Sequence, residues 1–213
     1  IGEGFSSPVV AGGTSEGRVF YSDLQGGKEI VHAVEAATGK ELWQTSLDNI
    51  FKDDWGQGPR CTPVVDGQRV FAQSCRGELQ CLSTGAGKVL WRRNYVPDFG
   101  AIFMGETGPA AGTTRHGNTG PPVVDANDGM HLWRVPLNTR LGRHAIAPVV
   151  VDDWAIVGSY QLGLVAVKVT RDGVNFKAEP AWTSKEVAPN FASPVAAGGY
   201  VYGVGPRKNV YCV

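Results

Sequence analysis

Two arginine–histidine pairs are the residues of this chain whose types point most directly to binding chemistry. Arg115–His116 and Arg143–His144 each precede, by a few residues, a short apolar run that opens with proline. A guanidinium beside an imidazole can bind a carboxylate or a phosphate through several hydrogen bonds. The alternative is that each pair only anchors its own loop on a solvated rim. Two histidines without a fixed spacing are weak evidence for a metal, so we predict no metal site.

Other polar residues that could contact a ligand stand in similar segments between repeated stretches of sequence. These segments, 48–60, 94–120, 137–145 and 184–192, are the least repetitive parts of the chain. Loops held by a rigid scaffold commonly carry binding residues, and we expect these loops to gather at one face. The candidate binding residues at this face are Asp53, Asp54, Trp55, Arg60, Arg115, His116, Asn118, Arg143 and His144.

Motifs of common catalytic centres are missing from the sequence. The glycine-rich GETGPAAG (105–112) lacks the lysine and the serine or threonine that end a phosphate-binding loop. No Gly-x-Ser-x-Gly stretch is present, so a nucleophile elbow is not indicated either.

Four cysteines are spaced in a way that does not fit a Cys-x-x-Cys zinc site: Cys61, Cys75, Cys81 and Cys212. Cys75 and Cys81 flank a predicted turn at residues 76–78. They could form a cross-strand disulfide if the register brings their Cβ atoms together. Equally, they could be two free, semi-buried thiols, because cysteine is among the most buried residue types.

Composition argues against a nucleic-acid-binding protein and against a membrane-spanning helix. Lys+Arg and Asp+Glu both total 20, so the chain lacks the basic excess of a nucleic-acid-binding protein. No run approaches the roughly 20 apolar residues of a membrane-spanning helix. With 29 glycines, 13 prolines and many β-branched residues, the chain is typical of short strands joined by tight turns.

A glycine followed four residues later by a tryptophan occurs three times, at Gly39–Trp43, Gly87–Trp91 and Gly129–Trp133. A looser fourth copy ends at Trp182. The tryptophans are separated by 48, 42 and 49 residues, close to the roughly 40–50 residues of one four-stranded propeller blade, including the WD-type repeat.

Five proline-led apolar runs keep the same period. They are SSPVV (6–10), CTPVV (61–65), GPPVV (120–124), IAPVV (146–150) and ASPVA (192–196). Proline cannot donate to a sheet ladder, so each should open the first strand of a blade, with the tryptophan in the last strand.

We therefore predict an all-β chain in which residues 1–213 form a single β-propeller domain, or a fragment of one, made of four-stranded antiparallel blades. The predicted blades span approximately 5–47, 60–95, 119–137, 146–184 and 192–213. An open array exposes two apolar end faces, so these blades should belong to a larger ring.

Each glycine–tryptophan pair has a predicted structural role. Gly39 can take a positive φ in the turn between the third and fourth strands. The tryptophan can lie over this turn and bury a large apolar area against the adjacent blade. On this interpretation Trp43, Trp91, Trp133 and Trp182 are structural residues and not ligand contacts.

Two blades depart from the pattern. Only 11 residues separate Pro122 from Trp133, against 28 to 35 in the other blades, so the third blade is incomplete. Either roughly 20 residues are absent near 124–126 or the blade is degenerate. In the fourth blade nine residues instead of four separate Gly173 from Trp182, an insertion of five.

The tract A-x-[DE]-x-x-T-G-K-x-x-W, present at Ala33–Trp43 and closely matched at Cys81–Trp91, resembles the repeat of the pyrroloquinoline-quinone-like (PQQ-like) β-propellers. The resemblance implies a ring of seven or eight blades and a periplasmic or secreted bacterial protein. The family includes quinoprotein dehydrogenases and cofactor-free propellers such as the lipoprotein scaffold of the bacterial outer-membrane assembly machine.

The enzymatic members of the family have an adjacent cysteine pair, a calcium held by Glu, Asn and Asp, and an aspartate base. None of these maps onto this sequence. We therefore expect a non-catalytic scaffold, without a cofactor, that binds a protein, peptide or glycan, including within a membrane-associated assembly. The alternative is a portion of a PQQ-dependent alcohol or sugar dehydrogenase, which would use PQQ with calcium.

Overall fold

The structure, a computed structural model, consists almost entirely of short antiparallel strands, and the predicted all-β propeller fold is confirmed. In the described residues the only helix is α1 (Tyr95–Phe99). The described residues are 2–12, 17–53, 56–103, 114–115, 122–137, 147–159, 162–189, 192–205, 207 and 209–213.

The chain divides into two compact units. The first comprises Ile1–Thr114 and Ala126–Gly129, and the second comprises Arg115–Asp125 and Met130–Val213. The expected single domain over 1–213 is therefore divided into two units in the structure. That these units form one domain stays a prediction.

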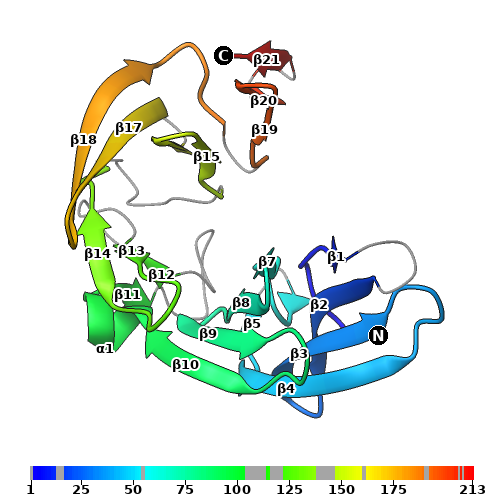
Figure 1. Ribbon diagram of the computed structural model, residues 1–213. Coiled ribbons are helices and arrows are strands. Elements are labelled where there is room, and N and C mark those ends of the chain that lie inside the picture. The colour runs from blue at the N-terminus through cyan, green and yellow to red at the C-terminus, as the bar shows by residue number, and fades with distance from the viewer. Residues whose placement is uncertain are drawn as a thin grey trace. The chain divides into compact units, whose positions relative to one another are not determined.

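Two four-stranded antiparallel sheets form the body of the first unit (Figure 1). The strands of the first sheet are β1 (Val9–Ala11), β2 (Arg18–Gln25), β3 (Lys28–Glu35) and β4 (Glu41–Asn49). Those of the second are β7 (Val64–Asp66), β8 (Arg69–Gln73), β9 (Glu78–Ser83) and β10 (Val89–Asn94). Smaller elements are β5 (Lys52–Asp53), β6 (Gly56–Gln57) and β11 (Ile102–Phe103), which pairs with β12 (Thr114–Arg115).

The core of the first unit lies between these two sheets. Alternate residues of β2 and β3 share one face, because successive side chains of a strand point to opposite sides. Phe20, Val31 and Ala33 on that face pack against Val70 and Leu82 of the second sheet, and all five are almost fully buried. The alternating apolar residues of β2 and β3 thus form the core between the first and second sheets.

Each of the first two tryptophans packs on the turn of the following sheet. Trp43, 9% exposed, donates its indole N–H to the carbonyl of Thr84 at 2.9 Å. A Cβ built on Gly87 would lie 2.4 Å from the Trp43 ring, so only glycine fits beneath the indole. Thr45 Oγ1 also donates to the Gly87 carbonyl at 2.7 Å.

The next repeat shows the same arrangement. Trp91 donates to the carbonyl of Ala126 at 3.0 Å, its ring lies against Gly129, and Arg93 Nε donates to the Gly129 carbonyl at 3.1 Å. The expectation that the indole lies over the turn of its own hairpin does not hold, since Gly39 would have no atom within 4 Å of an added Cβ. The glycine and the tryptophan that meet come from successive repeats.

Among the described residues of the second unit there are three sheets. The first pairs β13 (Pro122–Val124) with β14 (His131–Arg134). The second comprises β15 (Val149–Val151), β16 (Trp154–Ser159), β17 (Gly163–Asp172) and β18 (Asn175–Ser184). The third comprises β19 (Val195–Ala197), β20 (Tyr200–Val204) and β21 (Val210–Cys212).

The incomplete third blade has the form that its residue count predicts. β13 pairs directly with β14, with Val123 opposite Trp133, and Asp125 N donates to Met130 O at 2.8 Å across the turn. No residues remain for the two middle strands. Whether about 20 residues are absent there or the blade is degenerate stays open.

Proline opens or immediately precedes the first strand of all five blades, as predicted. Pro122 is the first residue of β13, and the other four strands begin one residue after their proline. In the fourth blade the five extra residues lengthen the last hairpin, because β17 and β18 each have ten residues and are joined by a turn at Gly173–Val174.

The last two tryptophans lack the turn contact found in the first unit. Trp133 is half-buried against Val135, Val165 and Val167. Trp182 is 41% exposed, so the expectation of a buried structural indole does not hold there. The physical reason is that no glycine turn of a following hairpin lies over it within the described residues.

Gly39 and Gly87 allow the interblade contact to be separated from backbone strain. Both occupy the same turn position with φ of 71° and 63°, but only Gly87 faces an indole. Gly39→Ala should cost about 1–2 kcal/mol for the left-handed backbone alone. Gly87→Ala should cost about 1–3 kcal/mol more from overpacking against Trp43. Chemical denaturation of the two variants measures the difference, and equal losses would contradict the docking geometry.

Trp91 and Trp182 form a second comparison. Trp91→Ala should lower the free energy of unfolding by about 3–5 kcal/mol, as for other buried large aromatics. Trp182→Ala should cost clearly less than Trp91→Ala, because 41% of Trp182 is exposed to solvent and fewer packing contacts are lost. Urea melts followed by circular dichroism would show this ordering, and a near-neutral Trp91→Ala would refute the role of that indole.

Candidate functional site

The described residues cover only part of the predicted binding face. Asp54, Trp55, His116, Asn118, Arg143 and His144 lie outside the described residues. Asp53 and Arg115 belong to the short strands β5 and β12. Arg60 is described with its side chain. The predicted cationic mouth formed by the two Arg–His pairs therefore stays a prediction.

Arg60 belongs to the first crossover, the segment 50–60 that links β4 to the second sheet. Its guanidinium lies over two aromatic rings, 5.5 Å from the centre of Phe5 and 5.2 Å from the centre of Phe51. Phe51 is fully buried. A cation over aromatic faces is favourable, so Arg60 holds the crossover in place as well as bringing a positive charge to it.

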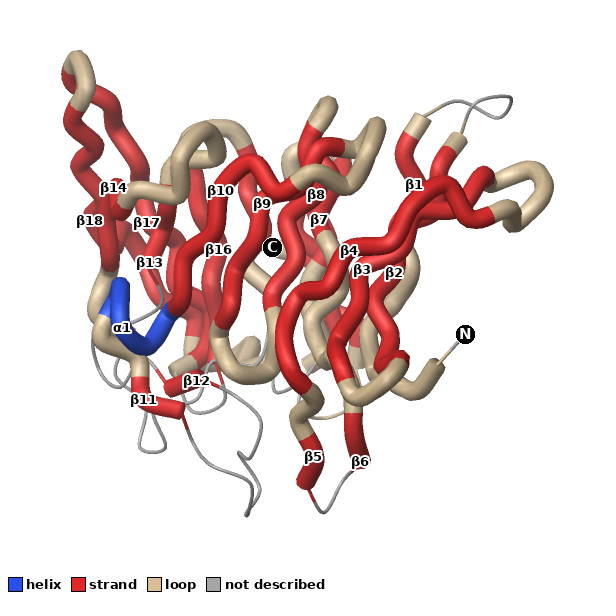
Figure 2. Tube along the Cα trace, turned by 90° about the horizontal axis from the view of Figure 1, so that it is seen from below, coloured by secondary structure: helices blue, strands red, loops and turns tan. Residues whose placement is uncertain are grey.

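Backbone hydrogen bonds fix the rest of the first crossover. Ile50 N donates to Gly27 O at 2.9 Å, and Gly58 N donates to Phe51 O at 3.1 Å. From the N-terminal side, Phe5 N donates to Pro59 O at 2.8 Å. Between these anchors β5 and β6 form a short ribbon, which Figure 2 shows at the same end of the first unit as α1 and β11.

Beneath the crossover lies a fully buried carboxyl group, Glu29, at the start of β3. Cys75 N donates to Glu29 Oε2 at 3.2 Å, and Glu29 Oε1 has no hydrogen-bond partner in the described residues. Burial raises the pKa of Glu29 to about 7; the hydrogen bonds from Cys75 and the charge of Arg60 act to lower it, and the charge of Asp48 to raise it. Near neutral pH this group is therefore partly protonated.

The adjoining turn between β8 and β9 is closed by a serine and an aspartate. Ser74 Oγ donates to Asp48 Oδ2 at 2.7 Å and accepts from the backbone N–H groups of Arg76 and Glu78 at 3.2 and 2.9 Å. Asp48 comes from β4 of the first sheet. The turn of the second sheet is thus fastened to the first sheet beside Glu29.

The cysteines are free thiols in the structure. Cys75 Sγ donates to the Gly58 carbonyl at 3.4 Å, whereas Cys81 lies within β9 opposite Phe71. The cross-strand disulfide considered for Cys75 and Cys81 is not formed, because Cys75 lies in the turn and Cys81 stands further along the ladder. In the structure both are buried thiols, and the oxidation state of the cysteines stays a prediction.

A second polar cluster, absent from the sequence-based candidates, lies on the other face of the first sheet. His32, fully buried, has its Nε2 2.9 Å from Asp23 Oδ1 and its Nδ1 3.0 Å from Glu41 Oε2. Tyr21 stacks on the imidazole with ring centres 4.8 Å apart. Burial acts to raise the pKa of Asp23, but hydrogen bonds from Gly2 and Gln25 and the nearby His32 outweigh it and leave the pKa lowered.

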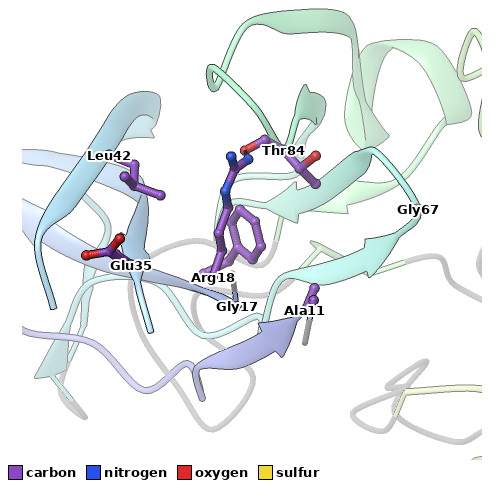
Figure 3. A pocket seen from close by; sticks show the side chains of 9 residues that line it. Ala11, Gly17, Arg18, Glu35, Leu42, Gly67 and Thr84 are labelled. Carbon is purple, nitrogen blue, oxygen red and sulfur yellow. Dashed lines mark hydrogen bonds between the residues drawn. The ribbon is translucent and has the colours of Figure 1, made fainter. Parts of the chain in front are cut away.

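One open cavity, of about 450 Å³, lies in the first unit at the turns opposite the crossover. Figure 3 shows Arg18 extending towards Thr84 across it, and Arg18 Nη1 donates to the Thr84 carbonyl at 2.7 Å. Glu35 on the rim accepts from the Thr38 hydroxyl. The cavity's charged groups are thus engaged in joining turns, and they do not converge on a common point as in a ligand site.

The cofactor of the quinoproteins can be tested against these groups. Calcium takes six to eight oxygen ligands. The Asp23 oxygens already accept from Gly2, Gln25 and His32, and Glu29 is partly neutral near pH 7. Among the described residues no group of three or more His, Cys, Asp or Glu could hold a metal ion.

Comparison with known proteins identifies the repeat. A family model described as "Outer membrane protein assembly factor BamB" matches residues 2–213. BamB from Moraxella catarrhalis has a similar structure, with a TM-score of 0.52 and 14% identity, covering 96% of this chain and 73% of that one. A quinohemoprotein alcohol dehydrogenase from Comamonas testosteroni gives a TM-score of 0.57 at 13% identity, covering 100% and 41%. At these identities the structures show the fold alone.

Two curated relatives match parts of the chain. Polyvinylalcohol dehydrogenase of Sphingopyxis sp. (strain 113P3) is 31% identical over 105 residues, which covers 41% of this chain and 16% of the relative. The Pseudomonas sp. enzyme of the same name is 28% identical over 139 residues, covering 56% and 21%. The chain thus spans about a sixth to a fifth of the length of these relatives.

No described helix is long and apolar enough to cross a membrane.

Glu29 should make stability depend on pH in a defined direction. Its pKa is about 7 when folded, against 4.5 for an ordinary glutamate, so between these values the folded state binds more protons than the unfolded state. The free energy of unfolding should therefore fall as pH rises from about 4.5 to about 7, by up to about 3 kcal/mol.

Glu29→Gln provides the control, because the amide keeps the shape of the neutral acid but cannot ionise. The variant should match the wild type near pH 4.5 and exceed its stability at pH 8, as measured by urea denaturation at both values. A wild type and variant with parallel pH profiles would contradict the assignment of Glu29 as the buried neutral acid.

Proposed function

Since the chain belongs to the PQQ-like β-propeller family, we propose that it is a non-catalytic binding module whose crossover loops hold a partner outside the bacterial cytoplasm. The partner is a protein, with a peptide or a glycan as the related possibilities. The match of the BamB family model over residues 2–213 supports a scaffold that assembles with other proteins. A periplasmic or secreted location follows from the same family and belongs to the proposal.

The main observation that supports this proposal is that contacts at both ends hold the first crossover in one conformation. Arg60 between Phe5 and Phe51, together with the hydrogen bonds at Ile50 and Gly58, fixes both ends of the β5–β6 ribbon. A loop held in one conformation loses less entropy on binding than a flexible loop. The ribbon can therefore present Lys52, which is exposed, and its neighbours to a partner surface.

The internal engagement of the charged groups also supports binding over catalysis. His32 contacts both Asp23 and Glu41, and Asp48 accepts from Ser74. A general acid or base must reach the substrate within hydrogen-bond distance. Asp23 and His32, 2% and 0% exposed, are closed off from any substrate.

Photo-crosslinking at two exposed lysines of the first blade tests the proposal. A photoreactive residue in place of Lys52, on the crossover ribbon, should give discrete protein adducts in cells of the source organism. The same residue in place of Lys40, in the turn at the opposite end of the blade, should give none. Adducts of equal yield at the two positions, or none at Lys52, would count against the crossover face.

The second candidate is a portion of a PQQ-dependent alcohol dehydrogenase, favoured by the similarity to two polyvinylalcohol dehydrogenases. A ligand at 100 times its dissociation constant stabilises the protein that binds it by about 2.7 kcal/mol. PQQ and calcium at such concentrations would therefore stabilise a dehydrogenase by about this amount. We expect no change in melting temperature on adding both. A rise of about 5–10 °C would instead favour the dehydrogenase.

A further inference from the structure

Cys61 and Cys75 lie beyond the same end of the β7–β8 strand pair, where the first crossover enters the second sheet. In the β7–β8 ladder Val64 lies opposite Phe71 and Val65 opposite Val70. Cys61 stands three residues before β7 and Cys75 two residues after β8, so both lie just beyond the same end of this ladder. Opposite residues of an antiparallel pair have Cα atoms about 4.5–5.5 Å apart, so the two segments that leave the ladder at this end start close together.

Contacts of the Cys75 side chain point in the same direction. Cys75 Sγ donates to the carbonyl of Gly58 at 3.4 Å, and Gly58 stands only three residues before Cys61. Burial raises the pKa of the Cys61 thiol to about 11, with the Glu29 charge adding to the effect. Burial also raises the pKa of Cys75, and Glu29 and Cys61 both add to this effect. Both thiols thus feel the charge of the Glu29 carboxyl, with Cys75 buried and Cys61 partly exposed.

We propose that Cys61 and Cys75 form a disulfide that ties the end of the first crossover to the β8–β9 turn, and that the free thiols are its reduced form. The reaction is thiol–disulfide exchange with a second disulfide, on a protein oxidoreductase or on glutathione disulfide. Both S–H bonds break, the Sγ–Sγ bond forms, and two electrons and two protons pass to the second disulfide, which becomes two thiols.

Cys81 and Cys212 are poorer partners for Cys75. In the β8–β9 ladder Gln73 lies opposite Leu79 and Phe71 opposite Cys81, so Cys81 stands about four residues, or roughly 13 Å, along the sheet from the level of Cys75. Cysteines whose Cα atoms are more than about 7 Å apart cannot be bridged without movement of the backbone. Cys212 belongs to the second unit.

Burial determines when the bridge can form. The raised pKa values leave little thiolate in the folded protein, so exchange there should be slow. The disulfide is then made while the second blade folds, and the same burial protects it from reductants afterwards. It would hold the crossover independently of the Arg60 contacts.

Peptide mapping tests the pairing directly, because trypsin places the cysteines on separate fragments. Cleavage after the flanking Arg and Lys residues gives fragments 61–69, 70–76, 77–88 and 209–213, each with one cysteine. The chain is refolded in a glutathione redox buffer, denatured, alkylated without reductant, digested and analysed by mass spectrometry. We expect a 61–69/70–76 cross-link and alkylated Cys81 and Cys212.

Alkylation of both Cys61 and Cys75, or a 70–76/77–88 cross-link in their place, would overturn the proposal. A second measurement uses stability. Oxidation should raise the melting temperature by roughly 5–10 °C, since the bridge closes a loop of about 15 residues. This difference between oxidised and reduced protein should vanish in Cys61→Ser and persist in Cys81→Ser, and its persistence in Cys61→Ser would also refute the pairing.

Discussion

The contact on which the first unit depends is the packing of an indole from one blade on the glycine turn of the next. At Trp43 and at Trp91 the same three elements recur: a glycine beneath the ring, an indole N–H donated to a turn carbonyl, and a second donor two residues later. Burying an indole without a partner for its N–H would be unfavourable, so the turn carbonyl is as necessary as the apolar contact. In the first unit the turn of the second sheet is therefore positioned by the first sheet.

This constraint acts at one end of each blade and leaves the other end free to vary. The glycine turns are short and nearly identical in sequence, whereas the crossovers at the opposite end differ in length and composition. The first crossover contains a ribbon, and the second contains a helix, α1, capped by Asn94. Variable loops on a repeated frame are the arrangement expected of a protein whose partners are recognised by its loops.

The sequence predicted the strands well because their signals are local. Proline marked the inner strands, glycine the turns, and the distance from Pro122 to Trp133 showed that the third blade has two strands. The glycine that each tryptophan contacts was not predictable from the sequence. The glycine and the tryptophan of one hairpin are close in sequence, but in the first unit the tryptophan packs on the glycine of the next hairpin, which only the three-dimensional structure shows. Trp182 illustrates the same limit, since its exposure depends on which segment packs over it in three dimensions.

The buried polar groups were missed for a related reason. Glu29 shares the face of Val31 and Ala33, and this period-2 pattern could have indicated that it is buried. Its hydrogen bond to Cys75 joins residues 46 apart in sequence and has no local signature. His32 likewise needs Asp23 and Glu41 from the strands on either side.

These interior groups connect the frame to the crossover. Glu29 reaches from β3 to the backbone of Cys75, and Asp48 reaches from β4 to Ser74, so two acidic residues of the first sheet hold the turn of the second. The crossover then lies over this junction, with Phe51 buried against Cys75. A force on the ribbon from a bound partner would therefore pass into both blades rather than into a flexible hinge. Rigid support of this kind lowers the entropy lost on binding.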